Sequence, residues 1–308
     1  MYDLIIIGSG PAGLSAAIYA QRGKLNFLVL EKTGFSGGQI MNTEQVDNYL
    51  GLNGIGGYDM AMKFREHADQ LEVTFETDEV VSVVPGQGKD SEQTYRITLK
   101  SGKILDSKTV LIATGAKHRP LGVPGEDAFA GKGVSYCATC DGAFYRDKTV
   151  AVVGGGDVAV EDAIYLSKLC GQVYLIHRRE GLRASKRVQE QMRQTENITF
   201  LPYHEVTEIA GEGSVGSLKL VQNQTGENKE IAVSGIFIAV GMLPETAAFL
   251  ELVETDAGGY VCAGEDGITS RPGVFVAGDV RTKALRQIVT AVSDGANAVA
   301  SVEKYLYM

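Results

Sequence analysis

Residues 2–32, YDLIIIGSGPAGLSAAIYAQRGKLNFLVLEK, decide the fold. An apolar run of strand character ends at a glycine-rich turn, small residues at helical spacing follow, and a second apolar run ends at Glu31. Gly8, Gly10 and Gly13 have the spacing G-x-G-x-x-G, in which the glycines permit a tight turn, close approach of a pyrophosphate and close helix packing. The stretch therefore predicts a βαβ unit that binds a dinucleotide.

The same order recurs in residues 149–179, TVAVVGGGDVAVEDAIYLSKLCGQVYLIHRR. Its turn has the related spacing G-x-G-x-x-A, at Gly154, Gly156 and Ala159. Strand-rich segments follow each unit, and self-similarity of this kind indicates a duplicated domain. We therefore predict two homologous dinucleotide-binding domains.

The end of the chain indicates how the two domains are connected. Residues 273–279, GVFVAGD, read as one more buried strand, and a helical stretch follows without a new βαβ unit. The simplest topology returns this tail to the first domain. The predicted fold class is α/β, with two Rossmann-like domains of which the second is inserted into the first. The expected bounds are 1–116 and 247–308 for the first domain and 117–246 for the inserted domain.

Composition limits the function classes. The chain has 308 residues, 44% of them hydrophobic, and a formal net charge of −9, which argues against nucleic-acid binding. No apolar run approaches the roughly 18 residues that span a bilayer. The strand pattern begins directly after Met1, where a signal peptide would otherwise lie. We therefore expect a cytoplasmic protein that binds neither nucleic acid nor membranes.

A close cysteine pair lies just ahead of the second glycine turn, in CATCDG. Cys137 and Cys140 have the spacing of a pair that can alternate between disulfide and dithiol. A zinc site would need two more ligands, and Cys170 and Cys262 form no second C-x-x-C pair, so we expect no metal. Asp141 follows directly and could move a proton to or from a thiolate, although an Asp in this place is also typical of a turn.

The second strand of each βαβ unit ends in residues of opposite charge. Glu31 is placed to accept hydrogen bonds from a ribose. The corresponding strand of the second unit ends in His177, Arg178 and Arg179, with Arg183 shortly after. Guanidinium groups bind phosphate oxygens bidentately, so this cluster favours the 2′-phosphate of NADPH over NADH, with a solvated basic strand end as the alternative.

The motifs GSGPAG, CATCDG, VVGGGD, HRREGLRASK and VFVAGDV occur in this order across the whole chain, which resembles low-molecular-weight thioredoxin reductases. The resemblance implies a homodimeric enzyme that moves electrons from NADPH through FAD to the cysteine pair and then to thioredoxin. It implies that Cys140 faces the flavin and that Cys137 attacks thioredoxin. The predicted catalytic residues are therefore Cys137 and Cys140, with Asp141 added because it directly follows the pair.

The motifs and the resemblance together predict the cofactor sites. FAD would be bound in the first domain by Gly8, Ser9, Gly10, Pro11, Ala12, Gly13, Glu31, Gly38, Gln39, Asn48, Thr114, Gly115, Gly278, Asp279, Arg286 and Gln287. NADPH would be bound in the inserted domain by Gly154, Gly156, Asp157, His177, Arg178, Arg179 and Arg183. By the resemblance, Lys132 and Phe144 would flank the thioredoxin site.

The disulfide has to meet both the flavin and thioredoxin, so we expect the inserted domain to turn about its two connections. Two other functions are open at this point. One is a related flavin enzyme that acts on a small-molecule dithiol or a different carrier protein. The other is a dinucleotide-binding sensor, which would bind FAD without NADPH-dependent turnover.

Overall fold

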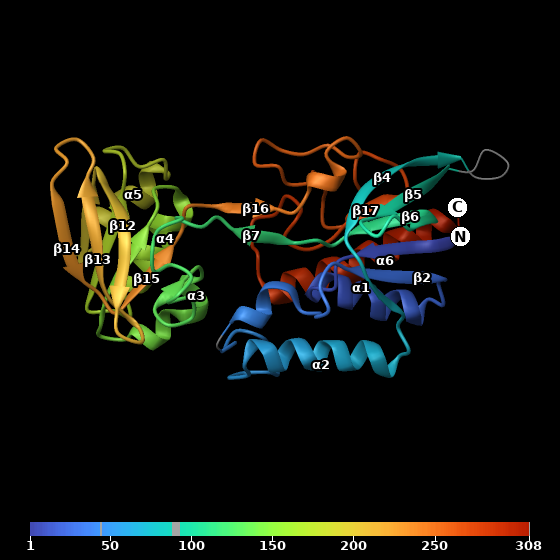
Figure 1. Cartoon of the computed structure of the whole chain (residues 1–308), viewed down its shortest axis with the longest axis horizontal. Coiled ribbons are helices and arrows are strands. Elements are labelled where there is room, and N and C mark those ends of the chain that lie inside the picture. The colour runs from blue at the N-terminus through green and yellow to red at the C-terminus, as the bar shows by residue number, and fades with distance from the viewer. Residues whose placement is uncertain (44, 88–92, 308) are drawn as a thin grey trace. The chain divides into compact units, whose positions relative to one another are not determined.

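The computed structural model describes residues 1–43, 45–87 and 93–307. The chain divides into two compact units, which are described separately. Unit 1 is Met1–Lys117 with Leu243–Met308, and unit 2 is His118–Met242. The chain passes between them through β7 (Ala116–His118) and β16 (Met242–Pro244), which pair with each other (Figure 1).

Unit 1 is built on a seven-stranded sheet with the order β3-β2-β1-β6-β5-β4, and β17 pairs with the C-terminal part of β6. Strands β1, β2, β3, β6 and β17 pair in parallel, whereas β4, β5 and β6 pair antiparallel. The bounds are β1 (Tyr2–Ile7), β2 (Phe27–Glu31), β3 (Phe75–Thr77), β4 (Val80–Gln87), β5 (Gln93–Leu99), β6 (Ile104–Ile112) and β17 (Val274–Val276). The pairing of β17 with β6 shows that the tail returns to the first sheet.

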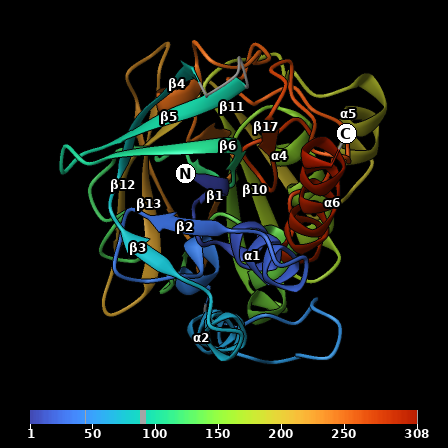
Figure 2. The ribbon, with the colours of Figure 1, turned by 90° about the vertical axis from the view of Figure 1, so that its right-hand side faces the viewer.

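Helices α1 (Pro11–Arg22) and α6 (Ile288–Leu306) lie side by side in unit 1 (Figure 2). Their contact is made by small residues, and a Cβ at Gly295 of α6 would lie only 2.1 Å from the carbonyl oxygen of Ala12. Ala16 of α1 and Ala298 of α6 are fully buried. The other helical segments of the unit are α2 (Gly57–Gln70), η1 (Gly38–Asn42) and η4 (Ala247–Phe249).

Unit 2 repeats this architecture. A parallel sheet with the order β11-β10-β9-β15-β8 packs helix α4 on one face and an antiparallel sheet, β12-β13-β14, on the other. The strands are β8 (Val134–Ser135), β9 (Thr149–Val153), β10 (Gln172–His177), β11 (Ile198–Pro202), β12 (His204–Gly211), β13 (Val215–Gln222), β14 (Asn228–Ala232) and β15 (Gly235–Ile238). The helical segments are α3 (Ala138–Asp141), η3 (Gly142–Tyr145), α4 (Asp157–Ser167) and α5 (Lys186–Arg193).

The predicted α/β class with two Rossmann-like units is confirmed. Residues Val150–Val153 of the central strand β9 are all apolar. Both faces of this strand are buried, since helices cover one face of its sheet and strands cover the other. No helix within the described residues combines the length and the apolar character that crossing a membrane requires.

Candidate active site

The first glycine turn connects β1 to α1 in unit 1. Gly8 has a φ of 106°, and its N–H donates to the carbonyl oxygen of Leu30 at 2.8 Å. A Cβ at Gly13 would lie 1.9 Å from the Gly8 oxygen, whereas a Cβ at Gly10 would meet no atom of the described residues within 4 Å. Gly10 therefore leaves open space at the start of α1, where no side chain caps the N–H groups.

We predict that alanine substitutions separate the packing role of Gly13 from the binding role of Gly10. Gly13→Ala should lower the free energy of unfolding by about 1–3 kcal/mol, because the new methyl group overlaps the Gly8 carbonyl. Gly10 has an ordinary φ of −70°, so Gly10→Ala should change that free energy by less than about 0.5 kcal/mol and weaken dinucleotide binding instead. Urea unfolding of both variants measures the difference, and equal stabilities would contradict it.

Glu31, the predicted ribose ligand, also closes the turn. Its Oε2 accepts hydrogen bonds from the N–H of Ser9 at 2.9 Å and from the Ser9 hydroxyl at 2.7 Å. The Gly37 N–H donates to the Ser9 carbonyl at 2.8 Å, and a Cβ at Gly38 would lie 3.4 Å from the Cα of Gly10. Residues 37–39, the GGQ segment, therefore lie against the start of α1.

The turn that follows β17 reaches the same place. Gly278 has a φ of 83°, and a Cβ there would lie 2.9 Å from the Cβ of Ala12 in the first turn of α1. Asp279 Oδ1 is buried and has no hydrogen-bond partner among the described residues, and burial raises the pKa of this carboxyl group. The Arg286 Nε donates to the Asp279 carbonyl at 3.4 Å. Since a buried polar atom without a partner is costly, Asp279 is suited to receive a ligand hydroxyl group.

Asn48 and Gln287 meet at the start of α6. The Asn48 amide donates to the Gln287 side-chain oxygen at 3.0 Å. Gln287 is also the N-cap residue of α6 and forms a capping box with Thr290. These contacts show that both residues have a structural role beside the predicted one.

Three other predicted residues lie near the connections. Thr114 donates its hydroxyl to the Glu245 carbonyl at 2.7 Å, and the Gly115 carbonyl accepts from the Glu245 N–H at 3.0 Å. The Gln39 side-chain amide donates to the Ala116 carbonyl. The end of β6 is thus joined to the returning chain and to the GGQ segment.

In the second glycine turn, in unit 2, some glycines are needed for close packing and one leaves open space, as in the first turn. A Cβ at Gly154 would lie 2.4 Å from the Ala239 carbonyl oxygen, and a Cβ at Gly155 would lie 2.3 Å from the His177 ring. A Cβ at Gly156 would meet nothing within 4 Å. Gly156 therefore leaves open space at the start of α4.

His177 and the arginines differ in their surroundings. The His177 ring is buried, and its Nε2 has no hydrogen-bond partner within the described residues. Burial, together with the positive charge of Arg183 and its neighbours, lowers the pKa of His177, so its ring is neutral at pH 7. Arg178, Arg179 and Arg183 are exposed, and in the described parts of the chain none of them pairs with a carboxylate. Their uncompensated charge suits a phosphate.

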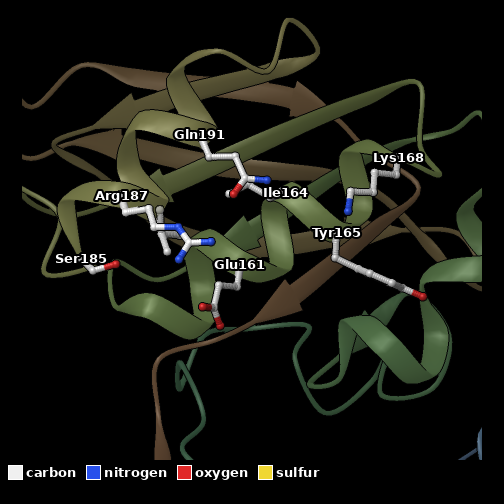
Figure 3. Close-up of a pocket in the computed structure, with 8 residues that line it drawn as sticks. Glu161, Ile164, Tyr165, Lys168, Ser185, Arg187 and Gln191 are labelled. Carbon is white, nitrogen blue, oxygen red and sulfur yellow. The ribbon is translucent and has the colours of Figure 1, made fainter.

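A cavity of about 450 Å³ lies between α4 and α5. Figure 3 shows that its lining side chains come from both helices, among them Glu161 and Ile164 of α4 and Arg187 of α5. It contains none of the predicted cofactor residues. The Ser185 N–H donates to Asp157 Oδ1 at 2.8 Å. This bond connects the basic loop, residues 178–185 between β10 and α5, to the start of α4.

Cys137 and Cys140 form a disulfide in unit 2, with their Cα atoms 5.3 Å apart. The Ser135 hydroxyl donates to Asp141 Oδ2 at 2.6 Å and accepts from the Cys137 N–H at 3.1 Å. The Asp141 N–H in turn donates to the Cys137 carbonyl at 3.1 Å. Asp141 is thus held beside the disulfide by Ser135, which the sequence reasoning missed. The sequence indicates this role of Ser135 only by placing a hydroxyl-bearing residue two positions before Cys137.

The residues predicted to flank the thioredoxin site are exposed in the same unit. Lys132 is exposed, and Phe144 keeps 38% of its surface in solvent, which is unusual for a large apolar side chain.

The two cysteines outside the disulfide have free thiols. Cys170 is buried, which raises its pKa to about 11, and Cys262 is half-buried.

The sequence profile of the pyridine nucleotide-disulphide oxidoreductases matches residues 2–295. The chain belongs to this family. It is therefore an oxidoreductase, and both glycine turns and the disulfide lie within the matched range. Membership implies a nicotinamide cofactor and a flavin.

Several relatives are thioredoxin reductases. The enzyme of Listeria innocua is 42% identical over 307 residues, which cover 99% of this chain and 94% of the relative. That of Bacillus subtilis is 42% identical and covers 99% and 95%. The crystal structure of thioredoxin reductase from Streptococcus pyogenes matches with a TM-score of 0.91 at 42% identity, covering 100% of this chain and 98% of the other. The Lactococcus lactis enzyme in its FR conformation matches at 0.68 with 40% identity, covering 100% and 99%. The resemblance found in the sequence is confirmed.

Proposed function

We propose that this chain is a thioredoxin reductase that uses FAD and NADPH. Electrons would pass from NADPH through FAD to the disulfide of Cys137 and Cys140, and from there to oxidised thioredoxin. The observation that carries the proposal is the disulfide itself, formed in a unit that also has a glycine turn and exposed arginines. The relatives named above support the same activity.

The residues of unit 1 fit FAD. The open space at Gly10 and the uncapped N–H groups of α1 suit a pyrophosphate. The unpartnered Asp279 Oδ1 suits a hydroxyl group of the polyol chain, and Gly38 lies against the same turn. When it is bound, FAD can exchange electrons with both a nicotinamide and a disulfide.

The residues of unit 2 fit NADPH. The open space at Gly156 and the start of α4 would receive its pyrophosphate. Arg178, Arg179 and Arg183 would bind the 2′-phosphate, which NADH lacks. The hydrogen bond of Asp157 to the basic loop would hold these arginines near the helix.

The reduced cysteine pair would transfer two electrons by disulfide exchange. The Cys137 thiolate attacks a sulfur of the thioredoxin disulfide, and a mixed disulfide forms while one thioredoxin thiolate leaves. The Cys140 thiolate then attacks the Cys137 sulfur, which releases the second thioredoxin thiolate and restores the disulfide of this chain. Asp141 is fastened beside the pair and would hold the proton that a thiol loses or gains.

We predict that Asp141→Asn lowers kcat with thioredoxin by about 100-fold, because the amide cannot carry that proton. The amide oxygen can still accept the Ser135 hydroxyl, so the loop should keep its geometry. Steady-state rates across pH 6 to 9 would measure the effect, with Asp147→Asn, at an exposed Asp of the same unit, as the matched control. If the kcat of Asp141→Asn equalled that of the wild-type protein at every pH, the proposed role of Asp141 in proton transfer would be contradicted.

An anaerobic titration with NADPH tests the proposed function. Flavin and disulfide together should take up about two equivalents of NADPH per chain, and Cys137→Ser should take up about one, since each couple accepts two electrons. A dinucleotide-binding sensor would leave the disulfide oxidised. Rapid turnover with small-molecule disulfides and none with thioredoxin would favour the related flavin enzyme.

The resemblance also supports a cytoplasmic homodimer in which unit 2 turns about β7 and β16 during turnover. The turning follows from chemistry, because one disulfide has to exchange electrons with the flavin and then with a protein substrate.

A further inference from the structure

We infer that Asp294 is a positioning residue for the flavin site: it binds the Gly278 N–H and the Lys283 ammonium group, so that Lys283 stays beyond hydrogen-bond distance from Asp279 Oδ1 and this atom can bind FAD. The inference rests on the proposed binding of FAD to unit 1. Asp294 would act through the two groups that it binds near Asp279, the Gly278 N–H and the Lys283 ammonium group.

Asp294 lies in α6 and is 5% exposed. Its Oδ2 accepts the Gly278 N–H at 3.0 Å, which ties the turn after β17 to the helix. Arg281 donates to both carboxylate oxygens, from Nη2 at 2.6 Å and from Nε at 2.9 Å. A buried carboxylate with these partners is fully hydrogen-bonded and fixed in place.

Lys283 lies between two carboxylates and is bonded to one of them. Its Nζ is 2.9 Å from Asp294 Oδ2 but 3.9 Å from Asp279 Oδ1, and its side chain is only 5% exposed. Asp279 Oδ1 has no hydrogen-bond partner within the described residues. Asp294 therefore holds the ammonium group beyond hydrogen-bond distance from the atom that would bind FAD.

The pKa values of the two carboxyl groups are shifted in opposite directions. Burial opposes ionisation of Asp294, but hydrogen bonds from Arg281 and Lys283 outweigh it and lower the pKa. Burial raises the pKa of Asp279, although Lys283 and Arg286 oppose the shift. If Asp294 lost its charge, the buried ammonium of Lys283 would need another anionic partner, and Asp279 is the carboxylate beside it. A lysine bonded to Oδ1 would then compete with the hydroxyl group of FAD.

Asp294→Asn tests the inference, because the amide oxygen can still accept the Gly278 N–H while the charge is lost. The FAD dissociation constant is measured from the flavin fluorescence released when the holoprotein is diluted. We expect it to rise about tenfold, the effect of losing a hydrogen bond to a charged group. In the double variant Asp294→Asn with Lys283→Met, which restores the net charge of the cluster, it should return to within about threefold of wild type.

Asp3→Asn is the matched control. Asp3 also accepts a backbone N–H, from Asn26 at 3.1 Å, and pairs with a lysine, Lys108, at 2.9 Å in unit 1. Its loss should leave FAD binding unchanged.

Each outcome bears on one claim. Wild-type affinity of Asp294→Asn overturns the inference, and so does a double variant that binds FAD no better than the single one. Folding of Asp294→Asn is judged by circular dichroism with excess FAD. If this variant does not fold, the double variant tests the inference: a double variant that folds and retains FAD supports it, and one that does not overturns it. A wild-type protein that binds no FAD would instead refute the proposed function.

Discussion

Cys140→Ser is expected to accumulate a covalent adduct with thioredoxin and to lose at least about 10³-fold in turnover, as expected when a nucleophile is removed. In the proposed sequence Cys137 attacks thioredoxin and Cys140 resolves the mixed disulfide. Without the second sulfur the mixed disulfide cannot go forward to products. It can only revert when the thioredoxin thiolate that left attacks it, which an excess of oxidised thioredoxin opposes. Cys140 lies in α3 and Cys137 directly precedes this helix. The hydrogen bonds of Ser135 and Asp141 hold the Cys137 backbone, so serine at position 140 should leave Cys137 in place.

Non-reducing gels with reduced variant and oxidised thioredoxin would show the adduct, and mass spectrometry would locate it. Cys137→Ser should form none, although it should lose turnover equally. Cys170→Ser is the matched control, because the Cys170 thiol is buried and its pKa is raised to about 11, so it should neither form an adduct nor affect the rate. A stable adduct with Cys137→Ser, and none with Cys140→Ser, would reverse the two roles.

The double variant Arg178→Gln with Arg179→Gln should lower kcat/KM for NADPH by about 100-fold, mainly through KM. Each charge-assisted contact to the 2′-phosphate contributes at least about tenfold. Both guanidinium groups are exposed and have no carboxylate partner in the described parts of the chain, so their removal breaks no ion pair of the fold. The rate with NADH should be almost unchanged.

Arg187→Gln is the control for this prediction. Arg187 is an exposed arginine of the same unit that lines the cavity between α4 and α5, and its loss should not affect the use of NADPH. Equal use of NADH and NADPH by the wild-type protein would contradict the proposed role of the arginines.

The parts of the fold that depend on local pattern were predictable from the sequence. Residues 2–32 form β1, the turn, α1 and β2 because strand and helix periodicity and the glycine spacing are local features. The strand at residues 273–279 predicted the return of the tail, and β17 pairs with β6. The division between Gly13, which packs, and Gly10, which leaves space, also agrees with the known roles of such glycines.

The contacts that hold the candidate site together were not predictable in this way. Asp294 reads in the sequence as a polar residue of a helix, and its bond to Gly278 depends on how α6 packs against the turn after β17. Ser135 acts through a tight loop that no motif specifies. His177 was grouped with the arginines by sequence position, yet its ring is buried against Gly155, because strand alternation turns it inward.

The measurement that tests the central claim most directly is steady-state oxidation of NADPH by the purified protein with thioredoxin from the same organism. The proposed function predicts that the rate of NADPH oxidation saturates with increasing thioredoxin concentration. The rate with NADH should be at least several-fold lower, and Cys137→Ser and Cys140→Ser should both abolish the reaction. NADPH consumption that is independent of thioredoxin, or that persists in either cysteine variant, would contradict it.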